Sequence, residues 1–290
     1  MQEISKQQKK CMRKPLKIKL EDLRQDQLKE LFLVVEKVFN KCEVDFYLLG
    51  AIARDTWYAK GQIESRATRD VDFAIYVSGE EHYEQVISEL VDNHGFSEIN
   101  NVPYRLQTPF TYTIDLIPFG EISIDEAVIP DENWDRPIFI NGFEEIFRNA
   151  TIQVKDEGDG LEFKVATLPA ILLLKLIAYD DRPEHRTQDP KDIAQIIENY
   201  FEVEKEMIWE EHHDLFDDTS ELNEIGAQVI GREISKILIE NDMLRDRVLN
   251  ILSLKKAEQY NILEAMVHDG LTLEKAESWF SVIKREIEEK

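Results

Sequence analysis

Apolar residues follow two different spacings along this chain, and each spacing predicts a different kind of element. In residues 20–41 they recur every three or four positions, which predicts an amphipathic helix. Apolar runs rich in β-branched and aromatic residues at 44–49, 70–77 and 112–119 predict buried strands, and 80–93 has helical spacing again. The first half of the chain is therefore predicted to be mixed α/β.

The pattern changes near residue 166. Residues 122–165 show short strands and turns, and the last two runs, 152–155 and 161–165, are joined by a glycine-rich acidic segment that predicts a hairpin. Thr167 is a predicted helix N-cap with Pro169 in the first turn, and helical spacing prevails beyond it. We expect a basic N-terminal tail at 1–19, an α/β domain at 20–166 and a helical C-terminal domain at 167–290.

Charge is distributed unevenly along the chain. It carries 35 basic and 59 acidic residues, a formal net charge of −24, whereas residues 1–19 hold seven basic residues and only one acidic residue, Glu3. Such a tail is able to reach phosphates, and it is equally able to stay solvated or fold back on the acidic body. Because an acidic protein repels nucleic acid at long range, an RNA substrate would need a local basic track.

The same sequence argues against a membrane protein. No apolar run approaches the roughly 20 residues of a membrane span. No apolar segment follows the basic N-terminal residues, as it would in a secretory signal. We therefore expect a cytoplasmic protein with no membrane partner.

Three carboxylates are the main candidates for chemistry. Asp70 and Asp72 begin the second predicted strand, where alternate side chains share a face about 7 Å apart. Asp115 lies inside the third predicted strand, where a buried carboxylate without a partner would cost several kcal/mol. Three such carboxylates can hold two Mg²⁺ ions about 3.5–4 Å apart, which stabilises the attacking and leaving oxygens of a phosphoryl-type displacement. The structural alternative is strand capping by Asp70, an ion pair between Asp72 and Arg54 or Arg69, and a local hydrogen bond at Asp115.

Gly50 adds weight to the chemical interpretation. It ends the first predicted strand and precedes a short predicted helix over 51–59. Free backbone N–H groups at such a turn let a phosphate approach closely. A glycine turn by itself is common, and its value here is its position one strand ahead of the aspartate pair.

Gly50, Asp70, Asp72 and Asp115 occur in the order typical of one superfamily. In this respect the chain resembles the DNA polymerase β-like nucleotidyltransferases, and within them the bacterial AbiEii-type abortive-infection toxins. The similarity covers about residues 44–200. The stretches that carry it are 49–55, 67–73, 114–120, 174–178, 181–182 and 189–193. Ala51 departs from the pattern because the superfamily usually has a serine there, and the 18-residue spacer between Ala51 and Asp70 is longer than usual.

The resemblance implies an α+β fold, with a nucleotidyltransferase-type mixed β-sheet domain and flanking helices followed by a helical C-terminal domain. It implies an enzyme that moves a nucleoside monophosphate from an NTP to an acceptor hydroxyl, with two Mg²⁺ ions, or Mn²⁺ in their place. Asp70 and Asp72 would bridge the metals that hold the triphosphate, and Asp115 would bind the metal at the acceptor hydroxyl. The residues assigned to the nucleotide are Gly50, Ala51, Arg54 and Lys175, where Lys175 has snorkelling to the surface as its alternative.

Toxin-like relatives imply an RNA or tRNA 3′ end as acceptor and a cognate antitoxin as partner, while a protein hydroxyl and a small molecule such as an aminoglycoside stay open. A second hypothesis, favoured by Ala51, is a catalytically inactive module of the same fold that binds a nucleotide or a partner. A third is an unrelated metal-dependent sugar-nucleotide transferase in which Asp115 has no role. Trp57, Tyr58 and Tyr104 are candidates for stacking on a base, although such aromatics more often belong to the core.

Overall fold

The computed structural model describes residues 14–23, 25–99, 102, 104–123, 127–128, 138–158, 160–217, 221–253 and 261–289. The strands are β1 (Leu16–Ile18), β2 (Asp45–Leu49), β3 (Asp70–Val77), β4 (Ser97–Glu98), β5 (Arg105–Gln107), β6 (Thr113–Gly120), β7 (Ala127–Val128), β8 (Ile138–Phe139), β9 (Thr151–Asp156) and β10 (Glu162–Ala166). The helices are η2 (Leu20–Leu23), α1 (Leu28–Lys41), α2 (Gly50–Lys60), α3 (Glu80–His94), α4 (Phe143–Asn149), α5 (Leu168–Asp181), α6 (Asp189–Glu211), η3 (His213–Leu215), α7 (Leu222–Ile237), α8 (Asp242–Leu252), α9 (Ile262–Met266) and α10 (Leu273–Glu288). This mixture confirms the predicted α+β class.

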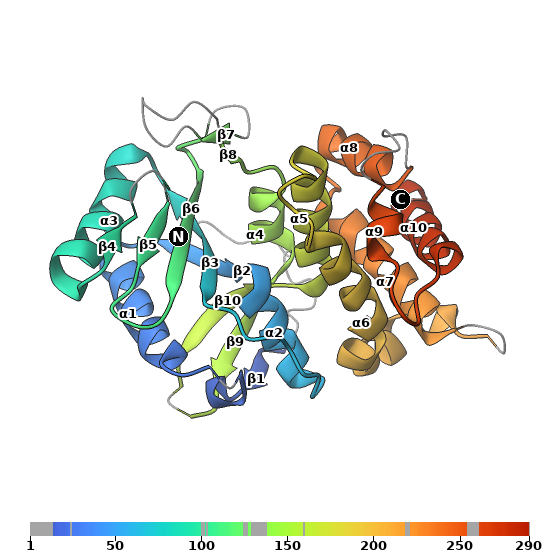
Figure 1. The fold of residues 1–290 in the computed structure, drawn as a ribbon, viewed down its shortest axis with the longest axis horizontal. Coiled ribbons are helices and arrows are strands. Elements are labelled where there is room, and N and C mark those ends of the chain that lie inside the picture. Colours follow the sequence, from blue (N-terminus) through green and yellow to red (C-terminus); the bar gives the residue numbers. More distant parts are fainter. Residues whose placement is uncertain are drawn as a thin grey trace, which may run out of the picture.

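Figure 1 shows a part built on a large sheet, coloured blue to green, beside a part built from helices, coloured yellow to red. Helices α4 and α5 lie where the two parts meet (Figure 1). Beyond β10, all the regular elements in the described residues are helices. The division of the chain into domains at residue 166 stays a prediction.

The large sheet has the strand order β1-β9-β10-β2-β3-β6-β5-β4. At its centre β3 runs antiparallel to β2 and parallel to β6, and β6 runs antiparallel to β5. The C-terminal end of β2 therefore meets the N-terminal ends of β3 and β6. This is the end of the sheet at which the predicted site residues lie.

Helices cover both faces of the sheet. On one face Phe32 of α1 packs on Phe73, with ring centroids 5.7 Å apart. On the other face Phe147 of α4 packs on Phe119, with centroids 5.4 Å apart. Because side chains alternate along a strand, the odd-numbered residues of β6, Asp115 among them, share the α4 face with Phe119.

The N-terminal elements differ from the sequence-based expectation. Residues 16–18, predicted as the end of a basic tail, form β1, which pairs in parallel with β9 through Leu16 and Val154. Residues 1–13 of the predicted tail lie outside the described residues. The helix predicted over 20–41 is interrupted, since η2 ends at Leu23 and Gln27 has a left-handed φ of 63° before α1 begins.

The region between β6 and α5 was only partly predicted. The hairpin is confirmed, because β9 and β10 pair antiparallel from Thr151–Ala166 to Lys155–Glu162. The short strands and turns expected before it include a helix as well, α4, which follows the left-handed Gly142.

The helical part is packed around α5 and α7. Helix α5 is apolar on almost every side and contacts α2, α6, α7 and α8. Helices α7 and α10 approach closely at Gly231, where a Cβ would come within 2.8 Å of the Ile283 carbonyl oxygen. In the described part of the chain, no helix combines the length and apolarity that crossing a bilayer requires.

Candidate active site

Four residues from four neighbouring strands form a row across the sheet. Arg105 on β5 pairs with Asp115 on β6, Asp115 pairs with Asp72 on β3, and Asp72 pairs with Leu49 on β2. Residues paired in register project to the same face. The row therefore places Arg105 and two carboxylates side by side on the α4 face, at the end of the sheet where β2 leads into α2.

Gly50 brings the backbone against this row. It has a φ of +70° at the start of α2, and a Cβ built on it would lie 2.0 Å from Asp72 Oδ2. Glycine is the residue that adopts such a conformation without strain and leaves the space open. The first N–H groups of α2 have no partner within the helix, so this turn has the properties of an anion-binding helix terminus next to a carboxylate.

Asp70 is the first residue of β3 and lies next to the row. Thr113 Oγ1 donates to Asp70 Oδ1 at 2.5 Å, and the Asp70 backbone N–H donates to Thr68 Oγ1 at 3.2 Å. Asp70 is exposed, and it lies on the same face as Asp72, two residues further along β3. The predicted pairing of these two carboxylates on one face is therefore present in the structure.

Asp115 makes a two-pronged ion pair with Arg105. Arg105 Nε donates to Asp115 Oδ1 at 2.6 Å and Nη2 donates to Oδ2 at 2.7 Å. This hydrogen bonding raises the pKa of the guanidinium above its already high value, so Arg105 stays charged. Both side chains are partly exposed, 35% for Arg105 and 22% for Asp115, so the ion pair is accessible to solvent.

Asp72 carries the most strongly perturbed carboxyl group of the row. Burial raises its pKa to about 7, and the negative charges of Asp115 and Asp70 act in the same direction, against the smaller opposite effect of Arg105 and Lys175. A carboxyl group that is kept close to neutrality by its neighbours is a group to which a cation would bind with a large gain. Perturbed groups of this kind cluster at functional sites.

The two basic residues predicted to bind the nucleotide occupy different environments. Lys175 lines the cleft, and its Nζ donates to Asp189 at 2.9 Å and to Asp192 at 2.6 Å. Arg54 points away from the cleft into the interior, where its side chain is 6% exposed and pairs with Asp55 at 2.9 Å and with Asp192 at 3.0 Å. Arg54 is not among the residues that line the cleft, because its guanidinium pairs with the buried Asp55 and the half-buried Asp192 between α2 and α6. Its assignment to the nucleotide stays a prediction.

The cleft in which this row lies has a volume of about 480 Å³, within the usual range for small-molecule sites. Its lining includes Gly50, Ala51, Asp70, Asp72, Asp115 and Lys175. Three further arginines, Arg66, Arg182 and Arg186, also line it, are exposed, and make no ion pair with any residue that the structure describes. One side of the cleft is thus rich in carboxylates and cations.

The other side of the cleft is apolar. Its wall is formed by Ile117, Ile138, Phe139, Phe143, Ile171, Leu174 and Ile177. Phe139 at the end of β8 is 50% exposed, whereas Phe143 is buried. The aromatic residues that the sequence suggested for base stacking lie elsewhere, since Trp57, Tyr58 and Tyr104 are at least 92% buried in the core.

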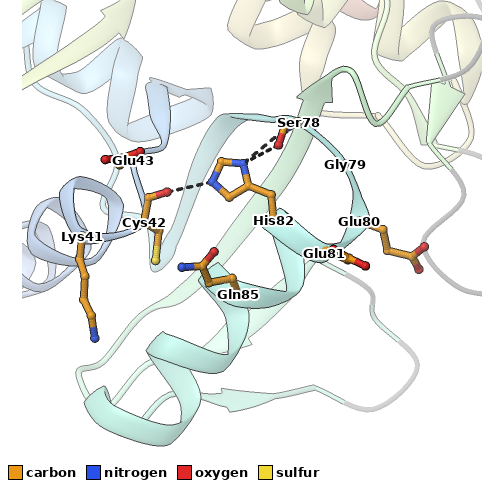
Figure 2. Close-up of a pocket in the computed structure, with 9 residues that line it drawn as sticks. All are labelled: Lys41, Cys42, Glu43, Ser78, Gly79, Glu80, Glu81, His82 and Gln85. Atoms are coloured by element: carbon orange, nitrogen blue, oxygen red, sulfur yellow. Dashed lines mark hydrogen bonds between the residues drawn. The ribbon is translucent and has the colours of Figure 1, made fainter.

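A second open pocket lies at the opposite end of β3, beyond its last residue, Val77 (Figure 2). There the ring of His82 links two elements, because Nε2 lies 2.8 Å from the Cys42 carbonyl oxygen and Nδ1 lies 3.3 Å from the Ser78 backbone nitrogen. A carbonyl accepts and an N–H donates, so Nε2 carries the proton and Nδ1 accepts. Nε2 thus joins α3 to the end of α1, while Nδ1 accepts from Ser78 just before α3 begins. This pocket is separate from the carboxylate row.

The donor chemistry of the row suits a hard divalent cation. Carboxylate oxygens are the ligands that Mg²⁺ prefers, and the glycine at position 50 keeps free the space beside Asp72 that a Cβ would fill. Within the described residues no three acidic, histidine or cysteine side chains stand close enough to one another to hold a metal ion. Both oxygens of Asp115 accept hydrogen bonds from Arg105 instead.

Sequence reasoning included Arg182, in the stretch 181–182 that carries the family resemblance, but not Arg66, Arg105 or Arg186. Arg105 lies on a three-residue strand too short for a periodic pattern, and Arg182 and Arg186 lie in the α5–α6 turn. A signal was present for Arg186 as well, because it lies in the same turn, four residues beyond Arg182. For Arg105 the only signal was its position next to Tyr104, which pointed to stacking instead.

The chain is weakly similar to several solved structures. Among solved structures, the antibiotic-resistance factor ANT(2'')-Ia is 13% identical over 66% of this chain and 100% of its own, with a TM-score of 0.38. An antigenic nucleotidyltransferase-like protein from Paracoccidioides brasiliensis is 14% identical over 69% of this chain and 92% of its own, with a TM-score of 0.38. A CCA-adding enzyme with ATP is 12% identical over 91% of this chain and 67% of its own, with a TM-score of 0.31. Likenesses this weak carry no further conclusion.

No curated protein matches the chain. The family model of the nucleotidyl transferase AbiEii toxin, Type IV toxin–antitoxin system, matches residues 40–280. That range includes the strands of the carboxylate row, the α2 turn and most of the helical part. The chain therefore belongs to the AbiEii nucleotidyltransferase toxin family.

Proposed function

We propose that this nucleotidyltransferase moves a nucleoside monophosphate from an NTP to an acceptor hydroxyl in a reaction that depends on a divalent cation, Mg²⁺ or Mn²⁺. The observation that carries the proposal is the in-register pairing of Asp72 with Asp115 beside the Gly50 turn. Asp70 and Asp72 would hold the cation that accompanies the triphosphate, and Asp115 would serve the acceptor side. A bound cation would offset the phosphate charge and lower the pKa of the attacking hydroxyl.

The triphosphate would lie along the charged side of the cleft. Gly50 and Ala51 line the cleft at the N-terminus of α2, where the backbone N–H groups would provide hydrogen bonds without the hydroxyl that serine would add. Arg66, Arg182 and Arg186 are exposed there with their guanidinium groups uncommitted to described carboxylates. Guanidinium groups match phosphate oxygens in geometry as well as charge, so these residues would bind the phosphates and the leaving pyrophosphate.

Lys175 would act close to the same phosphates. Asp189 and Asp192 fix its ammonium group at the cleft wall, and its charge lowers the pKa of Asp72. Acidic residues in the first turn of α6 are favourable in their own right because of the helix dipole. The lysine is therefore held in position and supplies positive charge to the site.

The apolar side of the cleft would receive the base. A nucleobase stacks on an aromatic face with little dependence on its identity, and such contacts are worth about 1–3 kcal/mol. Phe139 is the aromatic side chain with an exposed face in this wall, among the residues that the structure describes. We place the base on Phe139, with Leu174 and Ile177 beside it.

An RNA 3′ end is the acceptor that we propose. Arg66, Arg182 and Arg186 are exposed cations at the cleft of an otherwise acidic protein, and any of them that the triphosphate leaves uncommitted would supply the local positive charge that an RNA substrate requires. The Type IV toxin–antitoxin family also supports a cognate antitoxin that counteracts the activity.

The test is transfer of label from each of the four NTPs, labelled at the α-phosphate, in the presence of Mg²⁺. Total RNA, a protein lysate and a set of aminoglycosides are offered as separate acceptors. Label is expected in the RNA, and it should disappear with EDTA and in the Asp70→Asn, Asp72→Asn double variant. The matched control is Asp45→Asn, an exposed carboxylate at the far end of β2, which should retain transfer. Label in no acceptor contradicts transfer, and label that persists in EDTA contradicts metal dependence.

The second candidate is the inactive binding module, which the closed Arg105–Asp115 pair and the missing serine at position 51 favour. In that case the chain would bind an NTP but leave every acceptor unlabelled. The biological effect would also survive the Asp70→Asn, Asp72→Asn double substitution. The same labelling experiment therefore separates the two candidates.

A further inference from the structure

Arg105 occupies the coordination positions that a cation at Asp115 would need. Its Nε and Nη2 groups bind one oxygen of Asp115 each, at 2.6 and 2.7 Å. The pairing follows from strand register, since Arg105 and Asp115 are directly opposed on β5 and β6. The ion pair is therefore part of the folded sheet.

A guanidinium at this position opposes a divalent cation in two ways. It uses one lone pair on each Asp115 oxygen, and its positive charge repels a second cation a few ångströms away. In return it offsets part of the repulsion among Asp70, Asp72 and Asp115, which would otherwise be unfavourable in the nucleotide-free protein. The same contact thus stabilises the row of carboxylates and weakens its attraction for metal.

The pair is also placed so that it is able to open. The Arg105 side chain is 35% exposed and lines the cleft, whereas the buried Arg54 side chain is 6% exposed. Arg105 can leave Asp115 by rotating its long side chain into the cleft, without moving β5. The phosphates of a bound nucleotide would offer it new oxygen acceptors there.

We propose that Arg105 is a built-in counter-ion that withholds Asp115 from divalent cations until a nucleotide enters, when Asp115 exchanges the guanidinium for the metal and Arg105 turns to the phosphates. This inference rests on the proposed function. It predicts that the nucleotide-free protein binds metal more weakly than its carboxylates alone would allow. Arg105 is thus a positioning residue, acting through Asp115.

The test measures Mn²⁺ binding to the full chain without nucleotide, by calorimetry and by the paramagnetic resonance signal of free Mn²⁺. Arg105→Gln is expected to bind Mn²⁺ about 10-fold more tightly than the wild type. Arg105→Lys keeps the charge but loses the two-pronged contact, and should fall between them at about 3-fold. Arg66→Gln is the matched control, because it removes one positive charge from the same cleft without touching Asp115, and it should change the affinity less than 2-fold or so.

A thermodynamic cycle isolates the contact. In an Asp115→Asn background there is no carboxylate to withhold, so adding Arg105→Gln should leave Mn²⁺ affinity within about 2-fold. Thermal melting shows whether each variant is folded. If Arg105→Gln does not fold, the Mn²⁺ affinity of Arg105→Lys provides the test instead. Activity of the enzyme is not needed for any of these measurements.

Two results would overturn the inference while leaving the proposed function intact. One is unchanged or weaker Mn²⁺ binding in Arg105→Gln, which would mean that Arg105 orients Asp115 as a ligand. The other is an equal gain in Arg66→Gln, which would be a general charge effect. If the wild type and all variants fail to bind Mn²⁺, with or without a non-hydrolysable NTP, the metal dependence in the proposed function fails first and this inference fails with it.

Discussion

The backbone of Gly50 lies directly against the carboxylate of Asp72, so that a Cβ at position 50 would come within 2.0 Å of Asp72 Oδ2. Asp72 lies on β3, opposite Leu49, the last residue of the antiparallel strand β2. Gly50 follows Leu49 directly and begins α2. The helix N-terminus and the central carboxylate of the row are therefore one unit. A change at either residue displaces the other.

Comparing Gly50→Ala with Gly160→Ala should separate the effect on catalysis from the effect on stability. The new Cβ would push the Asp72 carboxylate out of the row, and we expect nucleotidyl transfer to fall by at least about 100-fold. The left-handed φ of +70° should in addition cost about 1–2 kcal/mol of unfolding free energy. The control is Gly160→Ala, which has a φ of +74° and no atom within 4 Å of the built Cβ. It should lose similar stability in urea denaturation and keep its activity. Equal activity in both variants would show that the Gly50 contact is irrelevant to transfer.

Asp72 should make the stability of the metal-free protein depend on pH. Burial raises its pKa from the ordinary 3.8 to about 7, so the folded state holds a proton that the unfolded state has released. The stabilising contribution is complete below pH 3.8 and is lost as pH rises through 7, with a change on the order of 2 kcal/mol between pH 5 and pH 8. Asp72→Asn should flatten this dependence in urea titrations at the two pH values. The exposed Asp70 gives the comparison, since Asp70→Asn should leave most of the slope in place. A slope that survives in Asp72→Asn would assign it to another group.

Phe139 should determine nucleotide affinity rather than the chemical step. Removal of a stacking face worth about 1–3 kcal/mol predicts an increase in the KM for NTP of roughly 5- to 150-fold in Phe139→Ala, with a smaller effect on kcat. Phe139→Trp keeps an aromatic face and should stay within a few-fold of the wild type. Phe139 is 50% exposed, so neither variant should unfold the chain. A KM that is the same in all three proteins would place the base elsewhere in the cleft.

Arg54 should matter for folding, in contrast to the arginines in the cleft. Its guanidinium lies between Asp55, whose side chain is fully buried, and Asp192. Arg54→Gln would leave the buried Asp55 carboxylate without its counter-charge, whereas Asp192 would keep Lys175, and we expect a loss of about 3–5 kcal/mol of unfolding free energy. The control is Arg148→Gln, which breaks an exposed pair with Glu144 and should cost about 0.5 kcal/mol or less. A stable Arg54→Gln protein with a raised KM for NTP would instead restore Arg54 to the nucleotide site.

Much of the site was accessible from local sequence patterns. Strand alternation places Asp70 and Asp72 on one face because side chains of a strand repeat every two residues, and this holds whatever the strand's neighbours are. The glycine that ends β2, the hairpin of β9 and β10, and the family resemblance were equally local features. These signals depend on residues close together in the chain, so they survive without knowledge of the tertiary structure.

The interaction partners of the site residues could not be predicted from local sequence patterns. Whether Asp115 meets Asp72 or Arg105, and whether Arg54 faces the cleft or the core, depends on strand order, register and helix packing. These join segments far apart in sequence, as in the Arg54–Asp192 pair. The periodicity of a segment reports which of its own residues share a face, but it says nothing about which other segment covers that face.

The sequence by itself thus determined most of the elements around the site, the shared face of Asp70 and Asp72, and the family. Only the tertiary structure decided that Arg105 pairs with Asp115 and that two aspartates of α6 hold Lys175. It also placed the exposed Phe139 in the apolar wall of the cleft. The physical reason is that a charge or a ring is satisfied by whichever group the fold brings within a few ångströms, and that choice is made by the packing of the whole chain.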